Sequence, residues 1–237
     1  FIMLISFLDI KSWVILLLFC SLGCQHNTGS ERNTVTIRLA SEPEQIDPLL
    51  GRTLADRQIN QLLFLPLLDY DPQTLELVPV LCEDLPAVTP IEEGPLSGGI
   101  RYEFTIREEA KWDNGDPVTA QDYIFTFKTM LHPGVHAAPF RAYFNFIKNI
   151  IPDPNNPKKF SVETDRPYIL AMEALGNIGI YPAYHYDPDQ VLKKVALEDF
   201  MDTERADVLV KNDTSLANFA AFFNNKNWEH IIGGSAY

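Results

Sequence analysis

Two histidines are the first residues of this sequence whose types and spacing could do chemistry, by binding a metal ion. His132 and His136 are four residues apart, the spacing that puts two metal-binding imidazoles on one face of a helix. Pro133 and Gly134 lie between them and break any such helix, so a metal pair is not favoured. His185 stands between two tyrosines, which indicates a packing or surface role. The sequence therefore predicts no metal site.

The residues that could act as nucleophiles or hold phosphates lack their usual partners. No serine stands in a Gly-x-Ser-x-Gly nucleophile elbow, and Cys82 has no obvious companion histidine. The glycine pair at 233–234 has neither the Lys-Ser/Thr of a phosphate loop nor the spacing of a dinucleotide loop. We therefore expect no catalytic residues and no cofactor, and a task other than catalysis.

Charge and cysteine content exclude further classes of protein. The 237 residues include 32 Asp plus Glu against 19 Lys plus Arg, a formal net charge of −13. A chain this acidic repels phosphate backbones, so nucleic acid is not an expected partner. The three cysteines, Cys20, Cys24 and Cys82, form neither an even set nor a Cys-x-x-Cys pair. We therefore expect neither a disulfide framework nor a zinc site.

The N-terminal segment has the character of an export signal. Residues 1–24 are almost wholly apolar, and the run 13–23 is too short to cross ~30 Å of hydrocarbon as a helix. It fits the hydrophobic core of a secretory signal peptide. Its ending, Ser-Leu-Gly-Cys at 21–24, resembles a bacterial lipobox, which implies lipidation of Cys24 and an exported, lipid-anchored protein with a polar tether at 25–33. A plain cleaved signal and an uncleaved membrane anchor are the alternatives.

Apolar patterning downstream predicts a mixed α/β chain. Alternation of apolar and polar residues predicts strands, and an apolar period of 3.6 residues predicts helices. The predicted strands are 34–41, 100–112 and 158–168, and the predicted helices are about 55–64, 120–131, 169–175 and 189–202. Residues 89–99 are rich in turn-forming types and predict a loop.

The stretch WDNGDPVTAQD, residues 112–122, predicts a strand–turn–helix corner. The Asp-Asn-Gly at 113–115 tolerates positive φ, which allows a sharp turn. Thr119 can cap the following helix, and Asp122, three residues on, makes a short-armed variant of the capping box. Nothing in the corner is reactive, so we interpret it as a structural device.

Four segments, taken in order, resemble one family. They are SEPEQIDPLL at 41–50, LLFLPLLDYDPQTLELVPVLCEDLP at 62–86, YEFTIREEAKWDNGDPVTAQDYIFTF at 102–127 and GGSAY at 233–237. The third is the most specific, with its aromatic strand, Trp, Asp-Gly and Pro-Val-Thr-Ala-x-Asp. This set is similar to the extracytoplasmic solute-binding proteins of peptide ABC transporters, the oligopeptide- and dipeptide-binding family. The likeness spans 34–237 and corresponds to less than half of a member, the N-terminal part.

The resemblance implies a two-lobed fold of the type II periplasmic-binding-protein class. Residues 34–64 and 183–237 would belong to the first lobe, and 65–182 to its accessory subdomain. The second lobe would be missing from this chain. The resemblance also implies capture of peptides in the cleft between lobes, and delivery to the permease and ATPase of an importer in the periplasm or cell envelope.

The resemblance defines the fold more closely than it defines the ligand-binding residues, for which it offers three candidates. Phe140 matches a position where peptide-binding members place an aromatic near the bound chain, and Tyr143 is its neighbour; ordinary core packing is the alternative for both. Arg52, after Asp47-Pro48, is the other candidate. The partner of the peptide α-amino group would lie beyond residue 237. Two alternatives stay open: the same scaffold binding a nickel complex, haem, sugar or opine, and an unrelated exported enzyme or surface interaction protein.

Overall fold

The computed structural model describes residues 36, 38–226, 231 and 234–235. The chain divides into two compact units, residues 1–39 and 40–237, and the fold below is that of the second. The predicted signal peptide 1–24, with Cys24, and the tether 25–33 lie outside the described residues.

The strand predicted at 34–41 is wrong where the structure can test it. The described residues of this segment take no regular structure. A strand is stable only when its backbone groups pair with a neighbour, and no described strand pairs with this segment.

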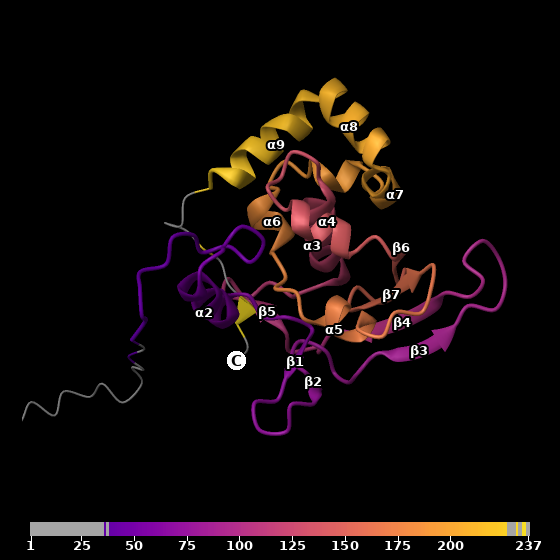
Figure 1. Cartoon of the computed structure of the whole chain (residues 1–237), viewed down its shortest axis with the longest axis horizontal. Coiled ribbons are helices and arrows are strands. Elements are labelled where there is room, and N and C mark those ends of the chain that lie inside the picture. The colour runs from indigo at the N-terminus through magenta and orange to yellow at the C-terminus, as the bar shows by residue number, and fades with distance from the viewer. Residues whose placement is uncertain (1–35, 37, 227–230, 232–233, 236–237) are drawn as a thin grey trace, which may run out of the picture. The chain divides into compact units, whose positions relative to one another are not determined.

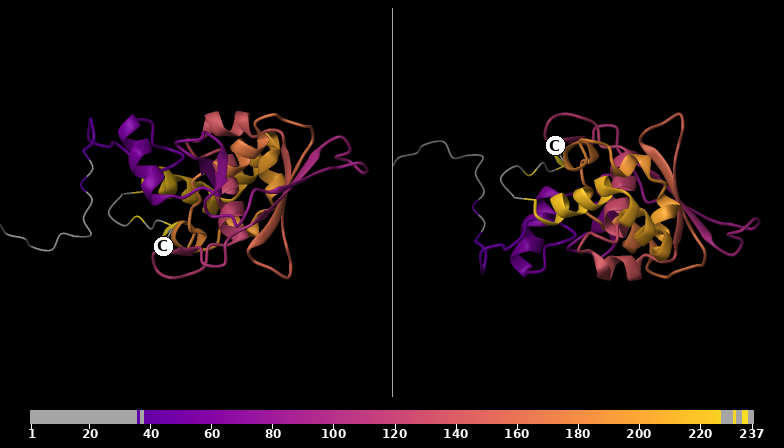
Figure 2. Two further views of the ribbon diagram at one scale, coloured as in Figure 1. Left: turned by 90° about the horizontal axis from the view of Figure 1, so that it is seen from below. Right: turned by 90° about the horizontal axis from the view of Figure 1, so that it is seen from above.

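A four-stranded antiparallel sheet forms one layer of the unit. Its strands are ordered β3 (Ala87–Pro90), β4 (Ile100–Thr105), β7 (Lys159–Thr164) and β6 (Ile147–Pro152). The β4–β7 register pairs Tyr102 with Val162 and Phe104 with Phe160, and all four side chains are buried. In Figure 2 the β3–β4 hairpin extends beyond the rest of the unit in both views. The predicted loop 89–99 begins two residues too early, because residues 89 and 90 pair with β4.

Two short sheets complete the β structure. β1 (Leu68–Tyr70) pairs with β2 (Leu77–Pro79), and β5 (Lys111–Trp112) pairs with β8 (Gly234–Ser235). The strand predicted over 100–112 is therefore interrupted between β4 and β5, where a turn is closed by the Ala110 N–H donating to the Arg107 carbonyl at 3.2 Å. The corner after Trp112 is confirmed, with Gly115 at φ +89°.

The unit has eight described α-helices. They are α2 (Leu54–Leu63), α3 (Ala120–Leu131), α4 (Ala138–Tyr143), α5 (Ala171–Gly176), α6 (Ala183–Tyr186), α7 (Leu197–Met201), α8 (Thr203–Asn212) and α9 (Thr214–Asn224) (Figure 1). The predicted helices near 55–64, 120–131 and 169–175 are confirmed. The Thr119 N–H and hydroxyl donate to the Asp122 carboxylate at 2.8 and 3.0 Å, so the predicted cap also forms.

α3 is buried on all sides except at Gln121, and this position makes it the centre of the core. Tyr123 contacts Phe160 of the sheet, with ring centroids 4.6 Å apart, and Phe125 meets Phe219 of α9 at 6.2 Å. The enclosed Asp122 and Lys128 of this helix both have hydrogen-bond partners, as buried polar groups require. The proposed division of the chain into first lobe and accessory subdomain stays a prediction.

The long helix predicted at 189–202 is wrong. Residues 192–194 form a single 3-10 turn, and α7 begins only at Leu197. The Asp187 carboxylate accepts hydrogen bonds from the N–H groups of Val191 and Leu192, at 2.7 and 2.8 Å, and Gln190 has φ +54°. These bonds fold the segment into a tight turn, so the apolar period never becomes a continuous helix.

Candidate functional site

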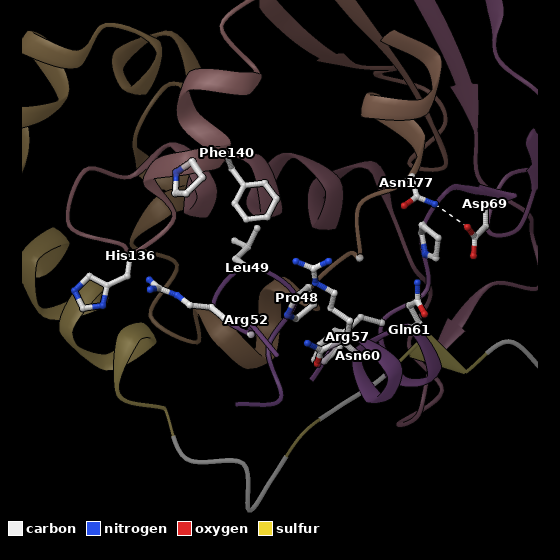
Figure 3. Close-up of a pocket in the computed structure, with 15 residues that line it drawn as sticks. Pro48, Leu49, Arg52, Arg57, Asn60, Gln61, Asp69, His136, Phe140 and Asn177 are labelled. Carbon is white, nitrogen blue, oxygen red and sulfur yellow. Dashed lines mark hydrogen bonds between the residues drawn. The ribbon is translucent and has the colours of Figure 1, made fainter. Parts of the chain in front are cut away.

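A cavity with a volume of about 590 Å³ lies between α2 and the segment leading into α4. Figure 3 shows Arg52 and Arg57 extending from the loop and helix on one side and Phe140 from the other. Its lining residues are Pro48, Leu49, Gly51, Arg52, Arg57, Asn60, Gln61, Phe64, Pro66, Asp69, His136, Pro139, Phe140, Asn177 and Gly179. The volume is in the range of small-molecule sites, and the wall combines apolar side chains with a few polar ones.

Asp56 holds the loop that forms one wall of this cavity. Its Oδ1 accepts hydrogen bonds from the N–H groups of Glu44 and Gln45, at 2.7 and 3.0 Å. Its Oδ2 accepts from the N–H groups of Arg52 and Thr53, at 2.9 and 2.8 Å. Four backbone donors converge on one buried carboxylate, so the loop before α2 has little freedom.

A second buried carboxylate ties the same loop to the core. Asp47 Oδ1 accepts from the Tyr181 hydroxyl at 2.6 Å and from the N–H groups of Leu49 and Leu50 at 2.9 Å. Burial raises the pKa of Asp47, while these hydrogen bonds act in the opposite direction. The Asp47 carbonyl also accepts from Asn60 Nδ2 at 2.9 Å, so the loop is fastened to α2 as well. The wall that carries Arg52 is thus rigidly placed.

The charged groups of the cavity are mostly cationic. Arg52 and Arg57 are exposed, and neither guanidinium has an ion pair or hydrogen bond within the described part of the chain. The acid of the lining, Asp69, is already engaged, because its Oδ1 accepts from Asn177 Nδ2 at 2.8 Å (Figure 3). His136 adds an imidazole to the wall. The cavity therefore presents positive charge on an otherwise acidic chain.

The structure brings together two of the three residues predicted to bind ligand. Arg52 and Phe140 both line the cavity, whereas Tyr143 does not. Tyr143 packs against Phe144 and Tyr168, with ring centroids 5.0 and 6.2 Å away. A hydrogen bond with Tyr168, together with burial, raises the pKa of Tyr143 to about 12. A role of these three residues in binding stays a prediction.

Sequence reasoning missed Arg57, and it considered His136 only as half of a metal pair with His132. Arg57 and Gln61 are four residues apart on α2, so they share one helix face with each other, and Phe64 follows one turn later. That polar pair on a predicted amphipathic helix was the available signal for Arg57. For His136 there was none, because its place in the cavity depends on the approach of the segment before α4 to α2.

A second described cavity, of about 260 Å³, lies near the start of α3. Its charged lining residues Lys128, Asp122 and Asp187 already have hydrogen-bond partners within the chain. Lys128 donates to the Leu192 carbonyl at 3.0 Å, and Asp122 accepts from Ala183 N–H at 2.9 Å. Asp187 accepts from the backbone as described above. Within the described residues no cluster of three or more His, Cys, Asp or Glu is placed to hold a metal ion. No helix there is long and apolar enough to cross a membrane.

Comparison with known proteins places the chain in a family. Residues 76–237 match the model for the middle region of bacterial extracellular solute-binding proteins, family 5. The periplasmic oligopeptide-binding protein OppA of Haemophilus influenzae is 31 % identical over 125 residues, which are 44 % of this chain and 23 % of that protein. Another Haemophilus influenzae binding protein is 23 % identical over 222 residues, covering 87 % of this chain and 41 % of its own length.

A solved structure shows the same fold. The oligopeptide-binding protein from Thermus thermophilus, complexed with a pentapeptide, superposes with a TM-score of 0.56 at 19 % identity, over 79 % of this chain and 31 % of that one. The mixed α/β fold expected from the sequence is therefore confirmed. The chain spans less than half the length of these relatives. With the family model matched over more than half of its residues, this chain belongs to the bacterial extracellular solute-binding proteins of family 5.

Proposed function

We propose that this chain captures peptides outside the cytoplasm and passes them to the permease and ATPase of an ABC importer. The observation that carries the proposal is the cavity between α2 and α4, with Arg52 and Arg57 on one wall and Phe140 on the other. The names of relatives support peptides as the solute, since they include oligopeptide- and dipeptide-binding proteins.

The chemistry of the wall suits a peptide. Phe140 offers apolar surface to side chains, while the amide of Gln61 and the side-chain oxygen of Asn177 can bond to a peptide backbone. Waters in a cavity of this size can fill the space that a small side chain leaves, so one site can accept many sequences. No group in the cavity is arranged as a nucleophile and base, and the proposed role is binding without chemical change.

The lipid anchor belongs to the same proposal. Cys24, at the end of the lipobox-like segment, would carry the lipid and hold the protein at the membrane surface beside its importer. Mass spectrometry of the N-terminal peptide from membrane fractions tests this: a diacylglycerol adduct on Cys24 supports it, and an unmodified, cleaved N-terminus refutes it.

Native mass spectrometry of the intact protein, purified without denaturation, tests the proposed function. The expected result is a set of adducts whose fragments are peptides. Adducts of a nickel complex, haem or a sugar would instead assign the same scaffold to another solute. A hydrolase activity that stays with the protein through further purification would refute a pure binding role.

A further inference from the structure

The arginines of the cavity stand apart from every other arginine of the 40–226 segment. Five arginines elsewhere each donate a guanidinium hydrogen bond to a carboxylate, an amide or a backbone carbonyl: Arg101, Arg107, Arg141, Arg166 and Arg205. Within the described part of the chain, Arg52 and Arg57 alone in this segment make none. Both lie in one cavity, five positions apart, and the rest of the arginines do not line it.

The acids near these arginines are not available as partners. Asp69 at the other end of the cavity bonds to Asn177, and Asp56 behind the wall is fully used by four backbone N–H groups. Glu44 lines a neighbouring cavity with Arg52, yet it makes no described ion pair with it. Among the described residues no carboxylate therefore forms an ion pair with either guanidinium.

A carboxylate is the group that fits this wall. A guanidinium presents a planar fork of donors that matches the two oxygens of a carboxylate, and such charge-assisted pairs are among the stronger hydrogen bonds in proteins. A solute that covers the wall displaces its water, and an arginine covered without a counter-charge is costly. Binding of a solute over these two residues consequently favours one that supplies a negative charge.

We infer that the cavity is a carboxylate-selecting subsite, in which Arg57 and Arg52 hold a carboxylate of the bound peptide. His136 closes the same end of the wall as Arg52 (Figure 3). This inference rests on the proposed function and adds to it the chemical class that the site selects. The carboxylate has two sources, the C-terminus of the peptide or an acidic side chain, and the pairing is the same for both.

Isothermal titration of the intact protein with matched peptides separates these cases. The probes are Ala-Ala-Ala, its C-terminal amide, and Ala-Glu-Ala amide. We expect the amide to bind about tenfold or more weakly than the free acid if the C-terminus is held. If the side chain is held, Ala-Glu-Ala amide binds about tenfold more tightly than Ala-Ala-Ala amide. Equal affinity for all three probes overturns the inference while leaving peptide binding intact.

Variants assign the selection to the arginines. In Arg57→Gln and Arg52→Gln the affinity ratio between carboxylate and amide probes should fall toward one, whereas Arg57→Lys should retain part of it because the charge remains without the fork. Arg205→Gln, which removes an exposed arginine of α8 outside the cavity, is the matched control and should leave the ratio unchanged. A ratio in Arg57→Gln and Arg52→Gln equal to that of the wild type would overturn the assignment.

Titration with citrate is a second experiment, and its result does not depend on peptide binding. If no peptide binds, the proposed function fails, and citrate then tests the carboxylate site by itself. Citrate binding that Arg57→Gln weakens and Arg205→Gln does not supports the site. No arginine-dependent binding of citrate or of any peptide probe overturns it. Circular dichroism spectra that match among the variants show that folding is unaffected, as expected for guanidinium groups without described contacts.

Discussion

Replacing Asp56 by asparagine should destabilise the protein through the loop that forms the cavity wall. The carboxylate has two oxygens that each accept two backbone N–H groups. An asparagine keeps one accepting oxygen and puts an NH₂ group in place of the other. Two of the four donors therefore lose their acceptor in a buried place, and the remaining two bond to a neutral group.

The expected size follows from those bonds. A hydrogen bond to a charged group contributes about 1.5 kcal/mol at the low end, so the loss of two gives a decrease in the free energy of unfolding of about 3 kcal/mol. For a chain of this length that lowers the melting temperature by roughly 6–12 °C. Burial acts to raise the pKa of Asp56, but backbone hydrogen bonds from Gln45, Thr53 and Arg52 hold it well below its ordinary value of 3.8. The stabilisation is therefore complete at neutral pH and is lost as pH falls below about 4.

Urea unfolding followed by near-ultraviolet circular dichroism measures the effect. The control is Glu42→Gln, which removes the same charge from an exposed residue of the same segment. At pH 7 we expect Asp56→Asn to lose about 3 kcal/mol more than the control, and the gap to narrow in acid. A difference from the control below about 0.5 kcal/mol would refute the view that Asp56 organises the loop.

Three further outcomes are expected. Gly99→Ala puts a Cβ 1.9 Å from the Thr164 carbonyl oxygen and should cost about 1–3 kcal/mol in urea unfolding; a cost below about 0.5 kcal/mol would contradict this. Burial raises the pKa of the Cys82 thiol to about 12, so iodoacetamide should modify it only after unfolding, and a labelled native peptide in mass spectrometry would show otherwise. Burial lowers the pKa of His132 to about 4, below the ~6.5 of an unfolded chain, so stability should fall as pH drops from about 6.5 toward 4. His132→Gln should flatten that slope, and identical pH profiles for the two proteins would refute the assignment.

Local rules predicted the elements whose ends are fixed by neighbours in sequence. The turn at Gly115 needs a residue that tolerates positive φ, and the start of α3 needs Thr119 and Asp122 three residues apart. Both requirements are visible in eleven residues. The helices α2 and α5 likewise follow from an apolar period over one short segment.

One local side-chain contact and one long-range strand pairing decided what the periodicity of the sequence did not predict. The apolar period at 189–202 was real, yet Asp187 bonds to the N–H groups of Val191 and Leu192 and turns the chain. β8 exists because residues 234–235 meet Lys111 and Trp112, more than a hundred positions earlier. The periodicity of a single segment carries no information about such partners.

The residues of the candidate site likewise fall into those that the sequence pointed to and those that only the fold reveals. The resemblance pointed to Arg52 and Phe140, and the fold places both on one cavity. Arg57 and His136 line one cavity only because the fold brings α2 and the segment before α4 together. Tyr143, one helical turn beyond Phe140, packs against Phe144 and Tyr168 and does not line this cavity, and its role in binding stays a prediction.

Hydrogen–deuterium exchange of the intact protein, with and without its solute, tests the central claim most directly. The solute is the one that native mass spectrometry identifies. The account predicts that binding slows exchange in two segments, residues 48–61 and 136–141, which form the two walls of the cavity. Slowed exchange confined to other regions, such as the second cavity beside α3, with no change in these two segments, would contradict it.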